Sequence, residues 1–285
     1  MTAKPAVGAR RLEARFDQIR QSGTPGLVAY VTGGDPDFEA SADILRALEQ
    51  GGADVIEIGV PFSDPIADGP VIQRATERAL AAGATLARTL DLVAHVRSSV
   101  STPIVLFTYV NPVLRMGTDQ FVARVADAGV DGVLLLDLPI EESAPMRDAL
   151  DRQGLDQIFL VSPTTSDRRL AEAAKLGRGF LYAISRLGVT GMRGTVADSA
   201  APLAHRLKAA TALPIAMGFG ISRPEHVKEV GALVDAAVVG SAIVQVIADE
   251  HAAGRAPARQ VEAFVRWLRQ GGEWPAAGSP AAQAR

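Results

Sequence analysis

The amino-acid sequence predicts an α/β protein in which eight strand–helix units close into a single (β/α)8 barrel, the TIM-barrel architecture. Short runs rich in Val, Ile and Leu recur along the chain without alternating with polar residues, as in strands buried on both faces of a parallel sheet. Amphipathic helical patterns separate these runs, so strand and helix alternate about eight times. No change of composition divides the chain, and residues 1–270 are expected to form one domain.

The repeating elements can be placed in order along the chain. The expected strands are Leu27–Val31, Val55–Ile58, Ile104–Tyr109, Gly132–Leu136, Gln157–Val161, Phe180–Ile184, Pro214–Met217 and Ala236–Val239. The helical patterns between them include Phe38–Gln50, Asp119–Ala128, Glu141–Gln153, Ser166–Leu176, Ala200–Ala210 and Arg223–Val230.

Two further helices are added to this repeat. An N-terminal helix over Ala9–Gln21 carries Leu12, Phe16 and Ile19 on one face, and it is expected to plug the bottom of the barrel. The segment Gly83–Val100 adds a helix between strands two and three, beginning near Thr85.

Helix boundaries and turns carry recognisable signals. Ser166 and Ser222 stand where N-caps are expected, and Glu225 follows Ser222 as in a capping box. Glycines just past helix ends are expected to be left-handed, namely Gly51, Gly129, Gly154, Gly177 and Gly231. A Gly-x-Asp triplet recurs before three of the expected strands, which predicts that the same turn is used each time. The triplets are Gly52-Ala-Asp54, Gly129-Val-Asp131 and Gly154-Leu-Asp156. The alternative is chance, because Gly and Asp are frequent in turns.

An open doubly wound sheet is the alternative to a closed barrel, because both are built from the same units. The open fold would be favoured by a GxGxxG fingerprint after the first strand. Thr32-Gly-Gly-Asp35 is not that fingerprint, so the barrel is preferred.

Composition excludes several classes of function. The net charge of −3 is spread over the chain, which argues against a nucleic-acid or membrane-surface role. The chain has no cysteine, and its four histidines show no metal-ligand spacing, so no metal site is expected. Residues 1–20 lack the apolar run of a signal peptide, and we expect a cytoplasmic protein. Residues 271–285 lack periodicity and are expected to form a disordered tail.

Two carboxylates stand where the chemistry of such a barrel is expected, at the C-terminal ends of its strands. Glu57 interrupts an apolar strand, where burial should raise its pKa into the range of a proton-shuttling acid. A structural glutamate paired with a cation is the alternative. Asp64 and Asp68 follow in a loop stiffened by three prolines, Pro61–Pro70.

Glycines near the last strand ends suggest an anion site. Gly218-Phe-Gly220 and Gly240-Ser241 each precede a helical pattern, and backbone N–H groups at helix starts attract phosphate. Plain helix caps are the alternative. Tyr30, Tyr109, Tyr182 and Phe219 stand near strand ends, where together they would suit an aromatic substrate, although each alone is more typical of a core.

At this point the sequence resembles the tryptophan synthase alpha subunit family, from about Phe16 to Val246. The segments that carry the resemblance are Tyr30-Val-Thr-Gly-Gly-Asp-Pro36, Glu57-Ile-Gly-Val-Pro-Phe-Ser-Asp-Pro-Ile-Ala-Asp-Gly-Pro70, Asp137-Leu-Pro-Ile-Glu-Glu142, Ser185-Arg-Leu-Gly-Val-Thr-Gly191, Gly218-Phe-Gly-Ile-Ser222 and Gly240-Ser-Ala-Ile-Val244. The second of these segments is the most specific.

The resemblance implies a retro-aldol cleavage of indole-3-glycerol phosphate to indole and glyceraldehyde 3-phosphate. Glu57 matches the glutamate that moves protons, and Asp68 matches the aspartate that interacts with the indole N–H. The implied substrate-binding residues are Tyr30, Phe107, Tyr109, Tyr182, Thr190 and Phe219. The implied phosphate-binding residues are Gly191, Gly220, Gly240 and Ser241. The loop that holds Gly188, Gly191 and Gly194 resembles a closing lid.

The resemblance also implies a partner. Members dock on a beta subunit as an alpha2beta2 heterotetramer, and pyridoxal phosphate (PLP) belongs to that subunit, so no cofactor is expected here. Pro61, Asp64 and Pro139 match the docking surface. This chain departs from the family in having Phe107 where an aliphatic residue is frequent, and in a segment after about Gly254 that looks longer than the family core requires.

Three other functions stay open on the residues alone. The chain could be a stand-alone lyase that releases indole, or an activating binding partner that has lost catalysis. A sugar-phosphate isomerase on the same barrel is a more remote possibility, because no His or Lys stands at a strand end.

Overall fold

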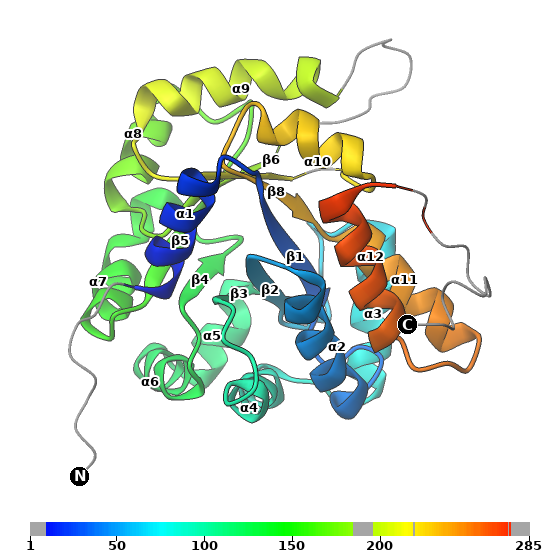
Figure 1. Cartoon of the computed structure of the whole chain (residues 1–285). Coiled ribbons are helices and arrows are strands. Elements are labelled where there is room, and N and C mark those ends of the chain that lie inside the picture. The colour runs from blue at the N-terminus through cyan, green and yellow to red at the C-terminus, as the bar shows by residue number, and fades with distance from the viewer. Residues whose placement is uncertain (1–9, 185–195, 219, 273, 275–285) are drawn as a thin grey trace.

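A computed structural model describes residues 10–184, 196–218, 220–272 and 274. Over these residues eight parallel strands close into a barrel in the order in which they occur along the chain, and helices surround it (Figure 1). The strands are β1 (Gly26–Thr32), β2 (Val55–Gly59), β3 (Ile104–Thr108), β4 (Gly132–Leu135), β5 (Asp156–Val161), β6 (Leu181–Ile184), β7 (Ile215–Gly218) and β8 (Ala236–Val239). The predicted closed barrel is therefore confirmed.

The helices fill the intervals between strands, some of them in pairs. They are α1 (Arg11–Ser22), α2 (Phe38–Gly51), α3 (Pro70–Ala81), α4 (Leu86–Val96), α5 (Val110–Met116), α6 (Thr118–Ala128), the short 3-10 helix η1 (Ile140–Glu142), α7 (Ala144–Arg152), α8 (Asp167–Leu176), α9 (Val196–Ala210), α10 (Pro224–Gly231), α11 (Ser241–Ala252) and α12 (Ala258–Gln270). The added helix between strands two and three is α4, and Thr85 caps it by accepting a hydrogen bond from the backbone N–H of Arg88.

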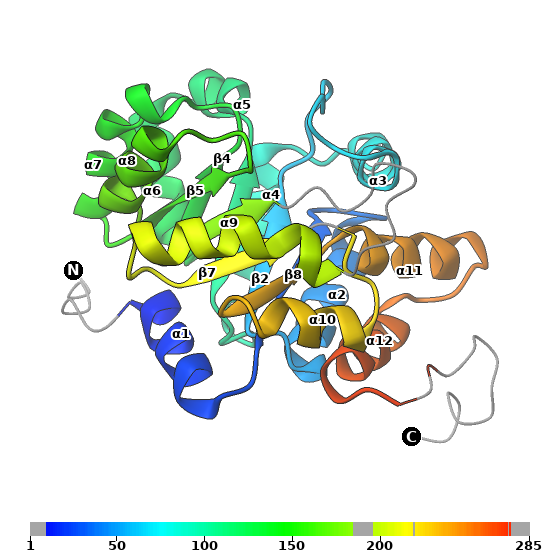
Figure 2. The same cartoon turned by 90° about the horizontal axis from the view of Figure 1, so that it is seen from above.

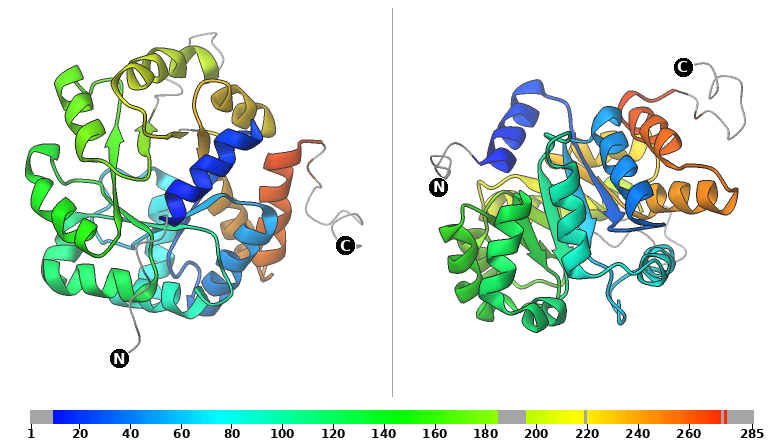
Figure 3. Two further views of the ribbon diagram at one scale, coloured as in Figure 1. Left: turned by 60° about the vertical axis from the view of Figure 1, so that its left-hand side comes forward. Right: turned by 90° about the horizontal axis from the view of Figure 1, so that it is seen from below.

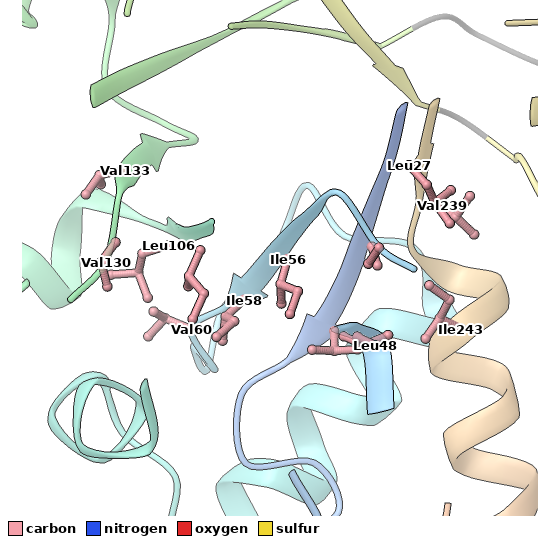
Figure 4. Packing of buried hydrophobic residues seen from close by; sticks show 14 of the residues in the cluster. Leu27, Leu48, Ile56, Ile58, Val60, Leu106, Val130, Val133, Val239 and Ile243 are labelled. Carbon is pink, nitrogen blue, oxygen red and sulfur yellow. The ribbon is translucent and has the colours of Figure 1, made fainter. Parts of the chain in front are cut away.

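Side chains of each strand alternate between two apolar layers, as the pleat requires. Those facing outward pack against the helices, and Figure 4 shows Ile56 and Ile58 of β2 near Leu106 of β3 in this layer. Those facing inward fill the barrel, with Val28, Val55 and Val105 among them. Because Val55 faces inward, Glu57 two residues later faces inward as well.

Helix α1 closes one end of the barrel, as predicted. In the left view of Figure 3 it lies across the ring of helices. Its buried residues Leu12, Phe16 and Ile19 belong to the same cluster as the inward-facing strand residues, and the ring of Phe16 lies 5.2 Å from that of Phe180. This end is the N-terminal end of the strands, which we call the barrel floor.

Aspartates at the start of several strands hold α1 on the barrel floor. Asp54, Asp131 and Asp235 each accept a hydrogen bond of 2.8 Å from the backbone N–H of a neighbouring strand. Arginines of α1 and the residue before it reach the same carboxylates or the buried Asp156, in the ion pairs Arg15–Asp54, Arg11–Asp131, Arg20–Asp235 and Arg10–Asp156. Each aspartate therefore joins the barrel to the plug.

The three Gly-x-Asp triplets do form one repeated turn. Gly52, Gly129 and Gly154 have φ of 95°, 84° and 74°. In each turn the residue after the glycine donates its N–H to the carbonyl five residues earlier, at 3.0–3.2 Å. Glycine is needed here because other residues rarely adopt positive φ.

Some predicted helix boundaries were wrong. Helix α2 includes Gly51, and the left-handed cap is the next residue, Gly52. Gly177 has a φ of −66°, and Gly231 is the last residue of α10, so neither is left-handed.

The predicted capping box at Ser222 is also wrong. Helix α10 begins at Pro224 with Arg223 as its N-cap and with no side-chain cap. The backbone N–H of Ser222 donates instead to Nδ1 of His226 at 3.4 Å. Pro224 fixes φ at the first helical position, which starts the helix without a cap.

Helix α12 and the residue Trp274 extend the ordered structure beyond what the helical periodicity had placed. Helix α12 packs beside α2, and its Arg269 donates to Asp54 at 2.5 Å. The ring of Trp274 lies 5.0 Å from Phe264 and 5.4 Å from Trp267. Residues 273 and 275–285 of the expected tail lie outside the described residues. Among the helices described, none is long and apolar enough to cross a membrane.

Candidate active site

The C-terminal ends of the strands form the barrel mouth, opposite the floor. Figure 2 shows α1 at one end of the barrel and α3 with its preceding loop at the other. Barrels of this kind place their chemistry at this end, on the loops after the strands.

Glu57 lies in the wall of the barrel and is 1% exposed. On β2 it stands opposite Tyr30 of β1 and Val105 of β3 in the strand register. Among the described residues, neither carboxylate oxygen has a hydrogen-bond partner. Burial raises the pKa of Glu57 to about 8, and the negative charge of Asp68 adds to this rise. The alternative of a glutamate paired with a cation is thus excluded within the described residues, and Glu57 holds its proton at neutral pH.

Asp68 is the second carboxylate at the mouth, and it lies on the loop just before α3. Its Oδ2 accepts a hydrogen bond of 3.3 Å from the hydroxyl of Tyr109. Burial raises the pKa of Asp68, while this hydrogen bond works against the rise. The two carboxylates therefore differ: Glu57 is buried with no partner among the described residues, whereas Asp68 accepts a hydrogen bond from Tyr109.

Aromatic rings from three strands surround Glu57. Tyr30 is 6% exposed, and its ring meets that of Phe107 edge-on at 5.8 Å. Tyr182 packs against the inward-facing layer of the barrel. Burial, together with nearby carboxylates, raises the pKa values of Tyr30 and Tyr182 well above the usual value. The hydroxyls of both tyrosines therefore stay protonated.

Gly59 makes room for Tyr30. A Cβ on Gly59 would lie 2.1 Å from the hydroxyl oxygen of Tyr30 and 2.7 Å from its ring. Gly240 also packs on this ring, because a Cβ there would lie 3.4 Å from Cβ of Tyr30. Tyr30 thus lies between the strand of Glu57 and the start of α11.

Of the predicted phosphate residues that the structure describes, Gly240 and Ser241 stand at a helix start, whereas Gly220 lies in the loop before α10. Gly220 has a φ of +66° and is exposed, four residues before α10. Gly240 is the residue before α11, and Ser241 is its exposed first residue. Free N–H groups at a helix start attract anions. Thr190, Gly191 and Phe219, like the expected lid with Gly188 and Gly194, lie outside the described residues.

The predicted docking residues differ in their exposure. Asp64 and Pro139 are exposed, but Pro61 is buried within the chain, so its surface is closed to a partner in this conformation. Ile66, which the sequence reasoning had missed, is 88% exposed on the same loop as Asp64. The one signal in the sequence is that Ile66 is an apolar residue within a proline-rich loop, Pro61–Pro70. Asp64 and Ile66 line a hollow of about 260 Å³, and Pro139 lines another of about 280 Å³.

Within the described residues, no cluster of three or more His, Asp or Glu side chains could hold a metal ion. The candidate site thus combines a buried acid, an aspartate that accepts a hydrogen bond, aromatic side chains and the start of α11.

The family model of the tryptophan synthase alpha chain matches residues 16–272. The chain belongs to the tryptophan synthase alpha chain family. It is a lyase of the tryptophan synthase type with a role in tryptophan biosynthesis.

Individual members of the family are similar in sequence to this chain over most of their length. The tryptophan synthase alpha chain of Solibacter usitatus is 49% identical over 261 residues, which cover 92% of this chain and 97% of the relative. That of Citrifermentans bemidjiense is 45% identical with the same coverage.

Solved structures agree as well. The alpha subunit from Legionella pneumophila superposes with a TM-score of 0.86 at 34% identity, covering 92% of this chain and 98% of that one. The ligand-free tryptophan synthase from M. tuberculosis gives a TM-score of 0.82 at 35% identity, covering 92% and 99%.

The family match corrects one prediction from the resemblance. The segment after about Gly254 was expected to exceed the family core, but the match continues to residue 272 and includes all of α12. The helix had been overlooked because its periodic residues follow a loop that breaks the strand–helix repeat.

Proposed function

We propose that Glu57 and Asp68 together cleave indole-3-glycerol phosphate, with Glu57 as the group that moves protons. The observation that supports this most directly is the state of Glu57: it is buried, has no hydrogen-bond partner within the part of the chain that the structure describes, and has a pKa of about 8. A carboxylic acid whose pKa lies near neutral pH can both donate a proton and accept one at the pH at which the enzyme works.

The reaction divides into two proton movements and one bond cleavage. Glu57 donates its proton to C3 of the indole ring, which leaves a positive charge centred on the ring nitrogen. Asp68 offsets that charge through the ring N–H. Glu57, now a carboxylate, accepts the proton of the hydroxyl on the side-chain carbon bonded to C3. That carbon becomes the aldehyde carbon, the C–C bond breaks, and its electron pair returns to the ring.

This sequence balances without a cofactor in this chain. Indole leaves with the first proton of Glu57 on C3, glyceraldehyde 3-phosphate leaves as the aldehyde, and Glu57 is protonated again by the proton of the substrate hydroxyl. The aromatic residues Tyr30, Phe107, Tyr182 and Phe219 would enclose the indole, and Thr190 would meet Asp68 when the loop after β6 closes. The phosphate would bind to N–H groups at Gly191, Gly220, Gly240 and Ser241, where helix starts favour an anion.

Indole is small and apolar, so a partner that receives it directly would prevent its loss. We propose that a PLP-containing beta subunit docks at the mouth, over Asp64, Ile66 and Pro139, to form an alpha2beta2 heterotetramer. The exposure of Ile66 and the two hollows beside these residues support that surface. As part of amino-acid biosynthesis the complex would work in the cytoplasm.

The test is an assay for indole release from indole-3-glycerol phosphate, with and without a beta subunit. We expect release by the complex, and a fall of roughly a thousand-fold or more for Glu57→Gln, because this side chain carries both proton movements. Wild-type turnover by Glu57→Gln would refute its role. Equal turnover without the beta subunit would favour a stand-alone lyase, and an inactive complex would favour a binding partner that has lost catalysis.

A further inference from the structure

The loop that carries Asp68 needs an external support. It joins β2 to α3 and belongs to neither, and its own backbone supplies only two short-range hydrogen bonds, from Ile66 N–H to the Asp64 carbonyl at 2.9 Å and from Asp68 N–H to the Pro65 carbonyl at 3.0 Å. A group that must face a developing charge has to be held in place before the reaction begins.

Tyr109 supplies that support through one hydroxyl group. The hydroxyl oxygen accepts a hydrogen bond from the backbone N–H of Ala67 at 3.2 Å. The same hydroxyl donates to Oδ2 of Asp68 at 3.3 Å. A phenol has one proton to donate, so the direction of the pair is fixed, with the backbone as donor and the carboxylate as final acceptor.

The ring of Tyr109 is itself held firmly. It is 4% exposed, and its centroid lies 5.1 Å from that of Phe62 at the base of the same loop. The next residue, Val110, donates its N–H to Oδ1 of Asp137 at 2.7 Å. The hydroxyl therefore comes from the junction of β3 and α5, outside the loop that carries Asp68.

Gln73 holds the backbone of the same residue from the other side. Its Nε2 donates to the carbonyl of Asp68 at 2.9 Å, and the side chain stands on the first turn of α3. The carboxylate of Asp68 is thus fixed by Tyr109, and its main chain is fixed by Gln73.

From this geometry we propose that Tyr109 is a positioning residue for Asp68, rather than only a wall of the substrate pocket, and that Gln73 assists it. The inference rests on the proposed role of Asp68 at the indole N–H. The hydrogen bond donated by Tyr109 also favours the ionised carboxylate, because burial raises the pKa of Asp68 and the Tyr109 hydroxyl opposes that rise.

The test compares Tyr109→Phe with wild type in the complex with a beta subunit. We expect kcat to fall roughly ten- to a hundred-fold, as for the loss of one hydrogen bond to a charged group, while KM changes less than about three-fold. The acidic limb of the pH–kcat profile should move to higher pH, because the hydrogen bond that favours the ionised form is gone.

Phe62→Leu is the matched control, since it removes the ring beside Tyr109 and leaves the hydroxyl in place. Its acidic limb should stay at the wild-type pH. Gln73→Leu should lower kcat without moving the limb, because Gln73 donates to main-chain carbonyls, those of Asp68 and Pro65. Circular dichroism and thermal melts establish that each variant is folded.

Two outcomes would overturn the proposal. One is a Tyr109→Phe variant with wild-type kcat. The other is a folded variant whose kcat falls while its acidic limb stays in place, which would make Tyr109 a wall only. Failure of the proposed function has a different signature, namely an Asp68→Asn variant as active as wild type.

Discussion

Replacing Glu57 by glutamine should make the protein more stable while it abolishes cleavage. In the folded chain Glu57 keeps its proton up to a pKa of about 8, whereas in the unfolded chain it ionises near 4.5. Between these two values ionisation favours the unfolded state, because only there is the carboxylate in water. Glutamine has nearly the same shape and never ionises, so it removes this penalty.

The size of the penalty follows from the two pKa values. The folded pKa is raised, so the penalty is absent below about pH 4.5, grows as the pH rises, and is constant above about pH 8. At pH 7 the difference from 4.5 is about 2.5 pH units, which corresponds to about 3 kcal/mol. Full burial means that solvent screening takes little from this figure. We expect the melting temperature to rise by roughly 5–10 °C.

The assay is urea unfolding of both proteins at several pH values from 4.5 to 8.5. The stability difference should be near zero at the lowest pH and largest at the highest. Glu49→Gln is a control of opposite sign. Partial burial works to raise the pKa of Glu49, but hydrogen bonds from Ser101 and Thr102 outweigh it and lower the pKa. Its replacement should therefore destabilise the protein at pH 7.

Either of two results would show that Glu57 is not held uncharged by burial. Glu57→Gln could prove no more stable than wild type at pH 7, in which case the carboxylate is solvated or paired in the folded state. The gain could also be the same at every pH, in which case it comes from packing and not from ionisation.

Other substitutions probe the floor and the mouth. Asp131→Ala should lower the free energy of unfolding by about 2–3 kcal/mol, because the N–H of Ile104 and the guanidinium of Arg11 both lose this carboxylate as an acceptor. The control is Asp148→Ala at an exposed position, which should change the free energy of unfolding by less than about 0.5 kcal/mol in the same urea titration. Gly59→Ala should reduce indole release by the complex at least ten-fold, because the new Cβ would lie 2.1 Å from the hydroxyl of Tyr30 and displace that ring. Unchanged turnover would show that the position of the Tyr30 ring does not matter for cleavage.

The strands and the two carboxylates could be predicted because their signals are local. Apolar runs bounded by glycine and aspartate predict the strands within one or two residues, and a glutamate inside one such run predicts a buried carboxylate, which the structure has at Glu57. The repeated Gly-x-Asp triplet likewise predicted a repeated turn, since left-handed glycine leaves a mark in sequence.

What escaped prediction depends on partners distant in sequence. The hydrogen bond between Tyr109 and Asp68 joins residues 41 apart, and no pattern near either one announces it. The arginines of α1 looked like an ordinary polar face, although Arg20 meets an aspartate 215 residues away. The start of α10 was misplaced because Ser222 carries the right residue type for a cap while Pro224 fixes where the helix begins.

The Asp–Arg pairs of the floor have a consequence for how this chain can change over time. They hold α1, which lies at the opposite end of the barrel from α3 and the loop before it (Figure 2), so stabilising substitutions there can raise the tolerance to mutation without touching Glu57 or Asp68. A protein with a more stable floor can tolerate destabilising substitutions at the mouth and still fold. For laboratory evolution of new substrates, the floor is therefore the place to stabilise first.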